Sequence, residues 1–409
     1  MRILFIANRI PYPPYRGDKL KIFNLAQQLH QRHELKLVTF YEKADELPYK
    51  MDLLRLFETV DLVYLNKFRA YWNVVQGLLF NKLPLQISFF KSRSMVETVA
   101  DVIYGFRPDA IHVQHLRMAQ FIPSNYRNKA ILDLPDAISM YYERIAEFSH
   151  NPFYKWVYKL EQNRLKEYES LILSKFQKVL CCSQEDLNYL KKEHPFPKYG
   201  VLENGVDVKN FTPDNDTVDL NQDLEPSANV AEKIILFTGN MNYAPNVDAV
   251  IYFAQEILPR ILEKWPQAIF EIAGQNPVNV VQKLDEHPNI RVTGFLPSLR
   301  EAYAKADVVV APLRFGAGTQ NKVLEALSMQ KPVVCSTIGF FGLSLENGAG
   351  IWCETNIEGF SKRILEIFSD PKYHSNLATI SGKIVRDRFN WQTISKKLES
   401  YCLDLQNEN

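Results

Sequence analysis

The sequence lacks the features of a membrane-spanning, nucleic-acid-binding or disulfide-stabilised protein. No apolar run approaches the roughly 18–20 residues that a membrane helix needs. The 48 basic and 47 acidic residues leave a net charge of +1, which argues against bulk nucleic-acid binding. The cysteines are odd in number and have no metal-type spacing, so we expect buried free thiols in a reducing cytoplasm. They are Cys181, Cys182, Cys335, Cys353 and Cys402.

Two nucleotide-binding signatures are also missing. No Gly-x-Gly-x-x-Gly follows the first apolar run, and no P-loop lysine motif occurs, which weakens the case for an NAD enzyme or a nucleotide hydrolase. The lone Asp-x-Asp, at 214–216, lies in an acidic stretch and is typical of a solvated loop. We therefore expect no metal site.

The chain does contain an alternation of short apolar runs and amphipathic segments along its 409 residues. Residues 18–32 carry apolar side chains at i, i+3, i+4 and i+7, which predicts a helix, and Ser183 begins a capping box for another. A strand, a helix and a strand in this order form a right-handed βαβ unit, the start of a doubly wound sheet. Buried parallel strands are predicted at residues 3–7, 35–40, 62–65, 110–113, 130–132 and 179–182.

A second alternating series follows a stretch rich in Asp, Asn and Pro, which predicts a linker. Its predicted strands are at 234–238, 269–273, 290–293, 308–311 and 332–336, and its predicted helices include 246–262 and 319–329. The fold class is therefore α/β, with two Rossmann-like doubly wound domains. We place them at residues 1–212 and 232–388, with the linker at 213–231 and a last helix at 389–409 that returns to the first domain.

The loop before the predicted helix at 319 has the features of an anion-binding site. A helix N-terminus carries unpaired N–H groups and a partial positive charge. Gly316 and Gly318 would let a phosphate approach the backbone, Lys322 would add a positive charge, and Glu325 would accept hydrogen bonds from sugar hydroxyls. The alternative is a helix that is merely capped by Thr319, with Glu325 as a solvated carboxylate.

In the first series, two segments lie where ligands of open α/β sheets bind, at the carboxyl ends of strands. Gly17 would let a ligand approach closely beside Arg16, and Asp18 would either cap the helix or contact that ligand. His115 falls past a strand end, where it would hydrogen-bond a sugar hydroxyl or shuttle an acceptor proton. His112 lies on the strand itself and is typical of a core histidine.

Two further features leave alternatives open. Asp133 and Asp136 follow the next strand and, as a carboxylate pair in a loop, invite a glycosidase interpretation. Residues 62–96 contain five basic residues, no acidic residue and many aromatic side chains. That composition suits a segment at a membrane surface, and it also suits a partly buried helix pair whose cations extend to solvent.

A set of short motifs occurs in one order along most of the chain. They are residues 14–18 and 179–186, Asn204-Gly205-Val206-Asp207, Gly239, Ala273-Gly274, Thr293-Gly294-Phe295, Leu324-Glu325-Ala326 and Phe389-Asn390-Trp391. This ordered set resembles the GT-B glycosyltransferases, in particular glycosyltransferase family 4 and its transferases of exopolysaccharide gene clusters. The resemblance implies a nucleotide-sugar donor in the second domain, an acceptor in the first, retention of anomeric configuration and no required metal.

The resemblance also suggests site residues. On the donor side they are Gly239, Asn240, Gly294, Phe295, Arg314, Gly316, Gly318, Thr319, Gln320, Lys322 and Glu325. On the acceptor side they are Arg16, Gly17, Asp18 and His115. We predict that His115, Asp18 and Lys322 are catalytic.

Two departures from the family pattern bear on mechanism. Glu325 matches the second carboxylate of the family's Glu-x7-Glu motif, which binds the nucleotide ribose, whereas the first carboxylate is replaced by Ala317. A double displacement through that residue has no nucleophile, which favours same-face attack assisted by the leaving phosphate. The Arg and Lys that usually follow Gly239 are absent, so Lys322, Arg314 or Arg16 would supply their charge.

The resemblance thus implies a retaining glycosyltransferase that moves a sugar to a glycan or lipid-linked acceptor in surface polysaccharide biosynthesis. It would use no cofactor besides its nucleotide-sugar substrate. It would be cytoplasmic, with peripheral contact to the inner face of the membrane through residues 62–96. Two alternatives remain open: a degenerate GT-B module that binds a nucleotide sugar or a partner without turnover, and a nucleotide-sugar epimerase.

Overall fold

The computed structural model describes residues 1–407 apart from residues 81, 150, 196–197, 214–231 and 344. The chain divides into two compact units. Unit 1 comprises Met1–Asn204, Ala317–Thr319 and Trp391–Asn409, and unit 2 comprises Gly205–Gly316 and Gln320–Asn390. Residues 205–212 thus group with unit 2, although we placed them in the first domain. Of the expected linker only residue 213 is described, and the Asp-x-Asp at 214–216 lies outside the described residues.

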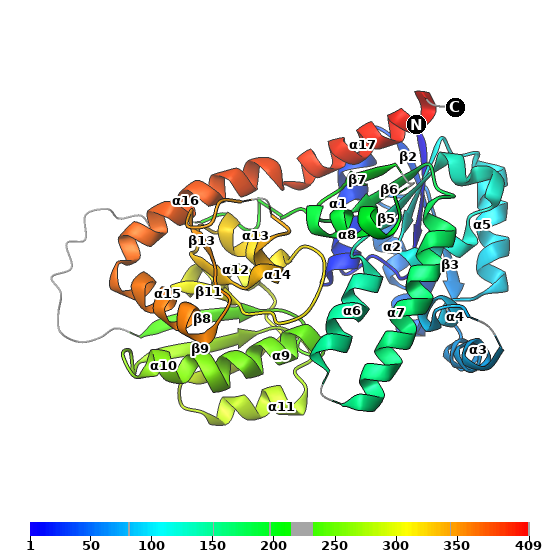
Figure 1. The fold of residues 1–409 in the computed structure, drawn as a ribbon. Helices are drawn as coiled ribbons and strands as arrows, with labels where there is room; N and C mark the ends of the chain where they lie inside the picture. Colours follow the sequence, from blue (N-terminus) through cyan, green and yellow to red (C-terminus); the bar gives the residue numbers. More distant parts are fainter. Residues whose placement is uncertain (81, 150, 196–197, 214–231, 344, 408–409) are drawn as a thin grey trace. The chain divides into compact units, whose positions relative to one another are not determined.

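Unit 1 is built on a seven-stranded parallel sheet in the order β3-β2-β1-β4-β5-β6-β7 (Figure 1). β1 pairs in parallel with both β2 and β4, so the strand order reverses direction there. The strands are β1 (Arg2–Ala7), β2 (Glu34–Tyr41), β3 (Thr59–Tyr64), β4 (Ala110–Gln114), β5 (Ala130–Leu134), β6 (Lys178–Cys181) and β7 (Tyr199–Val201).

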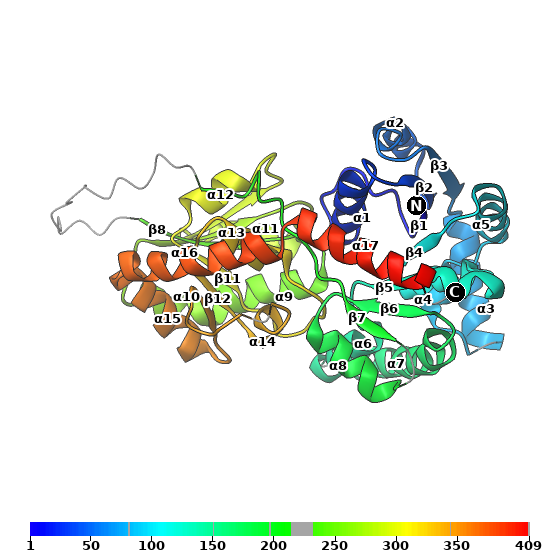
Figure 2. The ribbon, with the colours of Figure 1, turned by 90° about the horizontal axis from the view of Figure 1, so that it is seen from above.

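Helices cover both faces of this sheet, as Figure 2 shows. Because alternate side chains of a strand point to opposite faces, Ile3 and Phe5 pack in a core with α1 and α17, whereas Leu4 and Ile6 pack in a core with α5 and α7. The helices are α1 (Gly17–Leu29), α2 (Tyr49–Leu53), α3 (Lys67–Phe80), α4 (Leu85–Phe89), α5 (Arg93–Phe106), α6 (Ile138–Phe148), α7 (Pro152–Leu173), α8 (Gln184–Glu193) and α17 (Trp391–Asn407), with 3-10 turns at η1 (Ala44–Glu46), η2 (Leu116–Phe121) and η3 (Ser124–Lys129).

Unit 2 repeats this design with six parallel strands in the order β10-β9-β8-β11-β12-β13. The strands are β8 (Lys233–Thr238), β9 (Ala268–Ala273), β10 (Ile290–Gly294), β11 (Val308–Ala311), β12 (Val333–Cys335) and β13 (Ile351–Cys353). The helical elements are α9 (Ala244–Tyr252), a π turn at η5 (Phe253–Ile257), α10 (Leu258–Leu262), α11 (Asn279–Gln282), η6 (Lys283–Glu286), α12 (Leu299–Lys305), α13 (Asn321–Ser328), α14 (Thr337–Phe340), α15 (Ile357–Ser369) and α16 (Pro371–Arg388).

The predicted α/β class with two Rossmann-like sheets is confirmed, because each parallel sheet has helices on both of its faces. Ser183 caps α8 as expected, since its hydroxyl accepts a hydrogen bond from the backbone N–H of Asp186, but the full capping box does not form, because the Asp186 carboxylate bonds to the Ser183 hydroxyl and to the backbone N–H of Ala137. No described helix is long and apolar enough to cross a membrane.

Candidate functional site

Each sheet has one place where its strand order reverses. In unit 2 this switch point lies between β8 and β11, and in unit 1 between β1 and β4. The connections leave two such neighbouring strands in opposite directions, which opens a crevice beyond their carboxyl ends where ligands of α/β proteins bind. The loops at these two places carry most of the residues that the sequence suggests.

Lys322 is a buried cation at the unit 2 switch point. It is the second residue of α13, only 7% exposed, and its Nζ donates to Oδ1 of Asn246 at 2.8 Å. Nζ also lies 3.8 Å from the ring centroid of Phe237, near the end of β8. Burial lowers the pKa of Lys322 to about 7, although the nearby Glu325 raises it. An anion at this place would restore the charge of the amine.

Glu325 lies one turn further along α13 and is held by a tyrosine. Its Oε2 accepts from the hydroxyl of Tyr303 at 2.8 Å, and the same hydroxyl is 2.7 Å from Oγ1 of Thr238. Burial raises the pKa of Glu325, while Tyr303 and Lys322 lower it. The alternative of a solvated carboxylate is therefore wrong, because Glu325 is positioned by a hydrogen-bond network.

A close backbone contact shapes the loop after β8. A Cβ on Gly274 would lie 1.7 Å from the carbonyl oxygen of Gly239, so only glycine fits there. The side chain of Asn246 donates to the carbonyl of Asn240 at 3.0 Å, and a Cβ on Gly239 would meet that same amide at 2.6 Å. Asn246 therefore joins the Gly239–Asn240 turn to Lys322.

The other suggested donor-side residues are less closely tied to this cluster. Arg314 forms a two-point ion pair with Asp248 and lies 4.6 Å from the centroid of the Tyr252 ring, so its charge is already balanced. Phe295 is 52% exposed, and Gly294 ends β10 with φ 69°. Lys322, by contrast, forms no ion pair with another described residue.

The start of α13 differs from the expected one. The helix begins at Asn321 with Gln320 as its N-cap residue, and no side chain caps it. Thr319 belongs to unit 1, where its Oγ1 donates to the carbonyl of Cys182 at 3.0 Å. Gly318, with φ 77°, has no room for a Cβ, which would lie 2.8 Å from the carbonyl of Pro135, whereas Gly316 has room for one. The alternative in which Thr319 merely caps the helix is therefore wrong.

Asp18 and His115 come together at the unit 1 switch point. Asp18 is the second residue of α1 and does not cap it, because the N-cap residue is Arg16 and no side-chain cap bond forms. Its Oδ2 lies 3.9 Å from Nε2 of His115 and 3.4 Å from Nε of Arg9, and its Oδ1 lies 3.7 Å from Nε of Arg16. Burial raises the pKa of Asp18, but His115 and the two guanidiniums outweigh burial and hold that pKa well below its usual range.

His115 is a neutral imidazole near pH 7. It is 7% exposed, and burial, followed by the Arg117 charge, lowers its pKa to about 4. Its backbone has φ 74°, at the point where the chain turns from β4 into η2. A neutral imidazole beside a carboxylate suits hydrogen bonding to a hydroxyl.

Asp133 does not form a loop pair with Asp136. It lies on β5 and is fully buried, and its carboxylate binds Nζ of Lys21 at 2.7 Å and Nε2 of His112 at 3.0 Å. His112 is thus a partnered core histidine, as expected. The glycosidase interpretation fails because the Asp133 carboxylate is already occupied by two partners in the core of unit 1.

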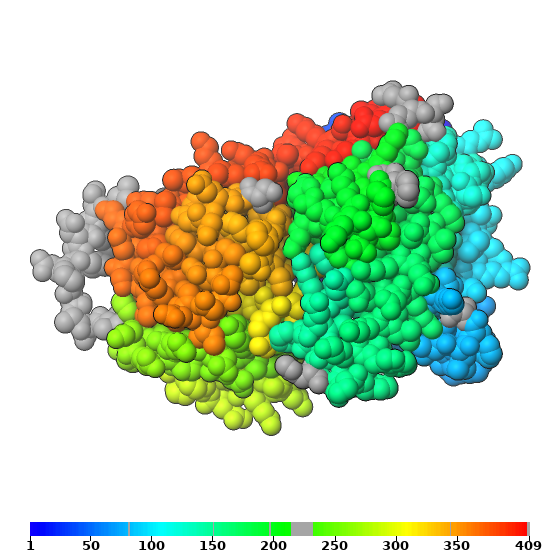
Figure 3. Space-filling view, in the orientation of Figure 1, coloured from blue at the N-terminus to red at the C-terminus, as the bar shows by residue number. Residues whose placement is uncertain are grey.

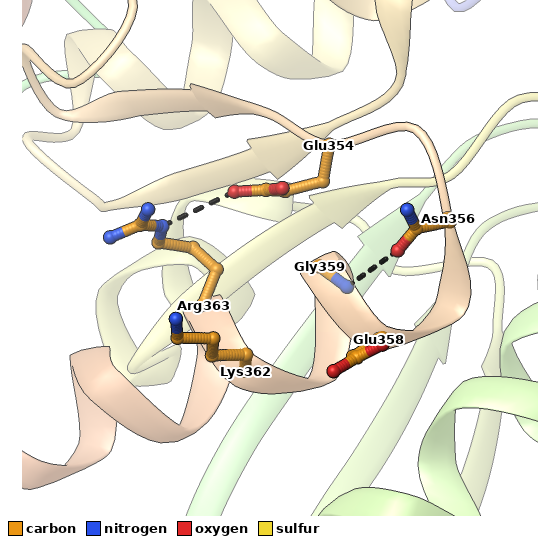
Figure 4. Close-up of a pocket in the computed structure, with 6 residues that line it drawn as sticks. All are labelled: Glu354, Asn356, Glu358, Gly359, Lys362 and Arg363. Atoms are coloured by element: carbon orange, nitrogen blue, oxygen red, sulfur yellow. Dashed lines mark hydrogen bonds and ion pairs between the residues drawn. The ribbon is translucent and has the colours of Figure 1, made fainter.

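One surface hollow lies elsewhere in unit 2, at the start of α15 (Figure 4). It has a volume of about 290 Å³, and none of the suggested site residues lines it. Two of its charged groups pair with each other, since Nε of Arg363 donates to Glu354 at 3.3 Å, and the neutral Asn356 caps α15 by accepting from the N–H of Gly359. Among the described residues, no three His, Cys, Asp or Glu side chains are grouped so as to hold a metal ion.

Comparison with known families settles the kind of domain that carries the unit 2 site. The family described as "Glycosyl transferases group 1" matches residues 232–370, which include β8, β11 and α13. Residues 232–370 are a group 1 glycosyl transferase domain. The family to which the sequence motifs point is thus confirmed for this part of the chain.

Several known proteins are similar to the whole chain or to most of it. An uncharacterized 44.6 kDa protein in the cps region of Klebsiella pneumoniae is 22% identical over 411 residues, 98% of each chain. An uncharacterized glycosyltransferase of Methanocaldococcus jannaschii is 26% identical over 71% of this chain and 73% of its own. The solved structure of HepE of Anabaena, in complex with UDP and glucose, has a TM-score of 0.68 and 17% identity over 99% of this chain and 100% of its own. The predicted GT-B fold is confirmed.

Several residues that build the two switch-point sites were not suggested by the sequence. In the glycosyltransferase domain they are Phe237, Asn246 and Tyr303, and in unit 1 they are Arg9 and Arg117. Asn246 and Tyr303 lie on helices, α9 and α12, whose periodicity is explained by core packing alone. Arg9 lies just after the end of a predicted strand, and this position could have identified it as a site residue.

Proposed function

We propose that the chain is a retaining glycosyltransferase that moves a sugar from a nucleoside-diphosphate donor to a glycan or lipid-linked acceptor in surface polysaccharide biosynthesis. The observation that carries this proposal is the buried Lys322, one turn from the tyrosine-bound Glu325, inside a group 1 glycosyl transferase domain. The amine would bind the diphosphate, and the carboxylate would accept hydrogen bonds from ribose hydroxyls. The cps-region relative supports the polysaccharide context, and HepE with UDP and glucose supports UDP-hexose as the first donor to test.

In the proposed reaction the acceptor hydroxyl oxygen bonds to the anomeric carbon as the bond from that carbon to the phosphate oxygen breaks. The bonding electron pair leaves with the diphosphate, and the hydroxyl proton passes to a phosphate oxygen on the same face. Lys322 and the N-terminus of α13 would stabilise the developing negative charge. No carboxylate is needed at position 317, where the chain has alanine. We propose that the reaction proceeds without a metal or other cofactor.

A screen of nucleotides by thermal shift tests the donor site. Wild type should be stabilised by one of UDP, GDP or ADP or by a sugar conjugate of it, because ligand binding to the native state raises Tm by mass action. Glu325→Ala should weaken that binding about 10- to 100-fold through the loss of charge-assisted hydrogen bonds.

The matched control is Glu301→Ala, which removes an exposed carboxylate of α12. The control should bind the nucleotide as wild type does. If no nucleotide at millimolar concentration shifts wild type, the transferase is contradicted and the degenerate module becomes the better account.

We also propose that the protein contacts the membrane through α3. Of its side chains, Phe68, Leu79 and Phe80 are 85%, 69% and 83% exposed, and Trp72 is also exposed. In Figure 3, α3 protrudes in blue beside α7. The two helices are joined by a hydrogen bond of 3.3 Å, which Arg164 of α7 donates to the carbonyl of Gly77 in α3. An exposed aromatic helix of this kind can insert at the headgroup level of a bilayer.

The charge on this surface is smaller than its sequence indicates. Lys67 pairs with Glu42 at 3.0 Å and Arg93 with Glu97 at 2.7 Å. No ion pair joins Arg69, Lys82 or Lys91 to another residue of the described part of the chain, so these three supply the attraction to anionic lipid.

Vesicle co-sedimentation tests this surface. The protein should bind vesicles that contain phosphatidylglycerol at low salt, and the triple variant Phe68→Ser, Leu79→Ser, Phe80→Ser should bind about tenfold or more weakly because it buries less apolar area. Met51→Ser, at an exposed apolar side chain on α2, should bind as wild type does. Equal sedimentation of wild type and the triple variant would refute the contact.

A further inference from the structure

Unsatisfied polar groups gather at the unit 1 switch point. Among the described residues, buried side-chain nitrogen and oxygen atoms without a hydrogen-bond partner include both amide atoms of Asn8, Nε of Arg9, both ring nitrogens of His115, Nε of Arg117 and Oδ1 of Asp136. These five residues follow the carboxyl ends of β1, β4 and β5. Nε of Arg9 and Nε2 of His115 lie within 4.0 Å of the Asp18 carboxylate without a hydrogen bond, and the other atoms have no partner among the described residues. Leaving buried polar atoms without hydrogen bonds is costly, so their concentration at one place indicates a ligand that satisfies them.

Arg117 is a fixed cation within this group. It lies on η2, and its guanidinium carbon is 5.2 Å from the ring centroid of Phe90, a core residue that is 4% exposed. No carboxylate of the described residues lies within 4.0 Å of the guanidinium nitrogens. This includes the carboxylate of Asp136. Burial lowers the pKa of Arg117, the charge of Asp136 raises it, and the charge of Arg9 lowers it again. The charge of Asp136 thus acts on Arg117 only at longer range, and the guanidinium has no direct anionic contact among the described residues.

The neighbouring charges do not supply that contact. The carboxylate of Asp18 is already engaged by two guanidiniums, since it lies 3.4 Å from Nε of Arg9 and 3.7 Å from Nε of Arg16. Burial and the nearby Asp186 raise the pKa of Asp136 to about 7, although the charge of Arg117 lowers it, so near neutral pH Asp136 carries only part of a negative charge. Near neutral pH the group thus presents an excess of positive charge and a neutral imidazole.

We propose that this site binds the acceptor through an anionic group, a carboxylate or phosphoryl group of an acidic sugar, with Arg117 as the main contact and Arg9 beside it. A guanidinium offers a planar fork of N–H donors that matches both groups. The neutral His115, beside Asp18, would then hydrogen-bond a hydroxyl of the same sugar. That the bound anion belongs to the acceptor follows only if the proposed function is correct. Binding of an anion at this site can be tested separately.

The test measures binding of three probes to the full chain by calorimetry or ligand-observed NMR. Methyl β-D-glucuronide carries a carboxylate, glucose 1-phosphate carries a phosphoryl group, and methyl β-D-glucoside is the neutral counterpart. At least one anionic probe should bind about tenfold or more tightly than the glucoside. Arg117→Gln should abolish this preference, whereas Arg55→Gln, at an exposed arginine, should keep it.

The outcomes separate the sources of the anion and the two proposals. Preference for the glucuronide alone assigns a uronic-acid acceptor, and preference for the phosphate alone assigns a sugar phosphate of the lipid-linked kind. Equal binding of all three probes, or a preference that survives in Arg117→Gln, overturns the inference. A loss of nucleotide affinity in Arg117→Gln would also overturn the inference, because Arg117 would then bind the nucleotide-sugar donor. If Arg117→Gln fails to fold, Arg9→Gln takes its place, with the same expected loss of preference.

Discussion

Replacing Lys322 by methionine should lower kcat/KM about 100- to 1000-fold, the effect expected when one preorganised electrostatic contact to a developing anion is removed. Methionine keeps the length and the apolar part of the side chain, so the packing against Phe237 is retained while the hydrogen bond to Asn246 is lost. The rate to measure is the release of nucleoside diphosphate from the donor that the thermal screen identifies.

The matched control is Lys283→Met, which removes an exposed lysine from η6 and should leave the rate unchanged. Lys322→Arg keeps the charge and should retain more activity than Lys322→Met. Wild-type turnover by Lys322→Met would show that the diphosphate is stabilised elsewhere.

The second large effect is expected at Asp133 and concerns stability. Asp133→Ala should lower the free energy of unfolding of unit 1 by about 3–5 kcal/mol, because it leaves Lys21 as an uncompensated buried charge. Lys21 is 1% exposed, and its remaining partner is the carbonyl of Leu202 at 2.8 Å. Hydrogen exchange should report the loss as faster exchange in peptides from β1, β4 and β5, with those of unit 2 unchanged.

Two further variants separate charge from packing at this place. The double variant Lys21→Met, Asp133→Leu should recover much of the lost stability, because a buried ion pair can be replaced by apolar groups at little cost. Asp101→Ala, at an exposed carboxylate of α5, should exchange as wild type does. If Asp133→Ala kept its stability and lost only activity, Asp133 would be a catalytic residue and not a structural one.

The fold was predictable from the sequence because buried parallel strands are continuous apolar runs. The strands at 3–7, 110–113, 234–238 and 308–311 were expected within a residue or two of their observed limits. Short elements were harder: β13 has three residues, too few for periodicity to identify. The helix at 319–329 was expected two residues early, because Thr319 is a good N-cap residue by type but bonds to Cys182.

The site was predictable only in part. Lys322, Glu325, Asp18 and His115 were found because they lie in or beside loops at strand ends. The sequence could not show that Arg314 is paired with Asp248, 66 residues away, or that Tyr303 binds Glu325. Nor could it show that Asp133 is buried against Lys21, because that contact joins residues 112 positions apart. Long-range pairing thus decided which charged residues remain available.

The central claim, that Lys322 meets the donor diphosphate, is tested most directly by proton uptake on nucleotide binding. With a pKa of about 7, Lys322 is mostly neutral at pH 8, and a diphosphate beside it would raise that pKa and draw a proton from solution. Calorimetric titration of UDP, or of the nucleotide that the screen selects, at pH 8 in buffers of different ionisation enthalpy measures this uptake. We predict about one proton per nucleotide for wild type and none for Lys322→Met. Nucleotide binding without proton uptake, or with equal uptake in Lys322→Met, would contradict the account.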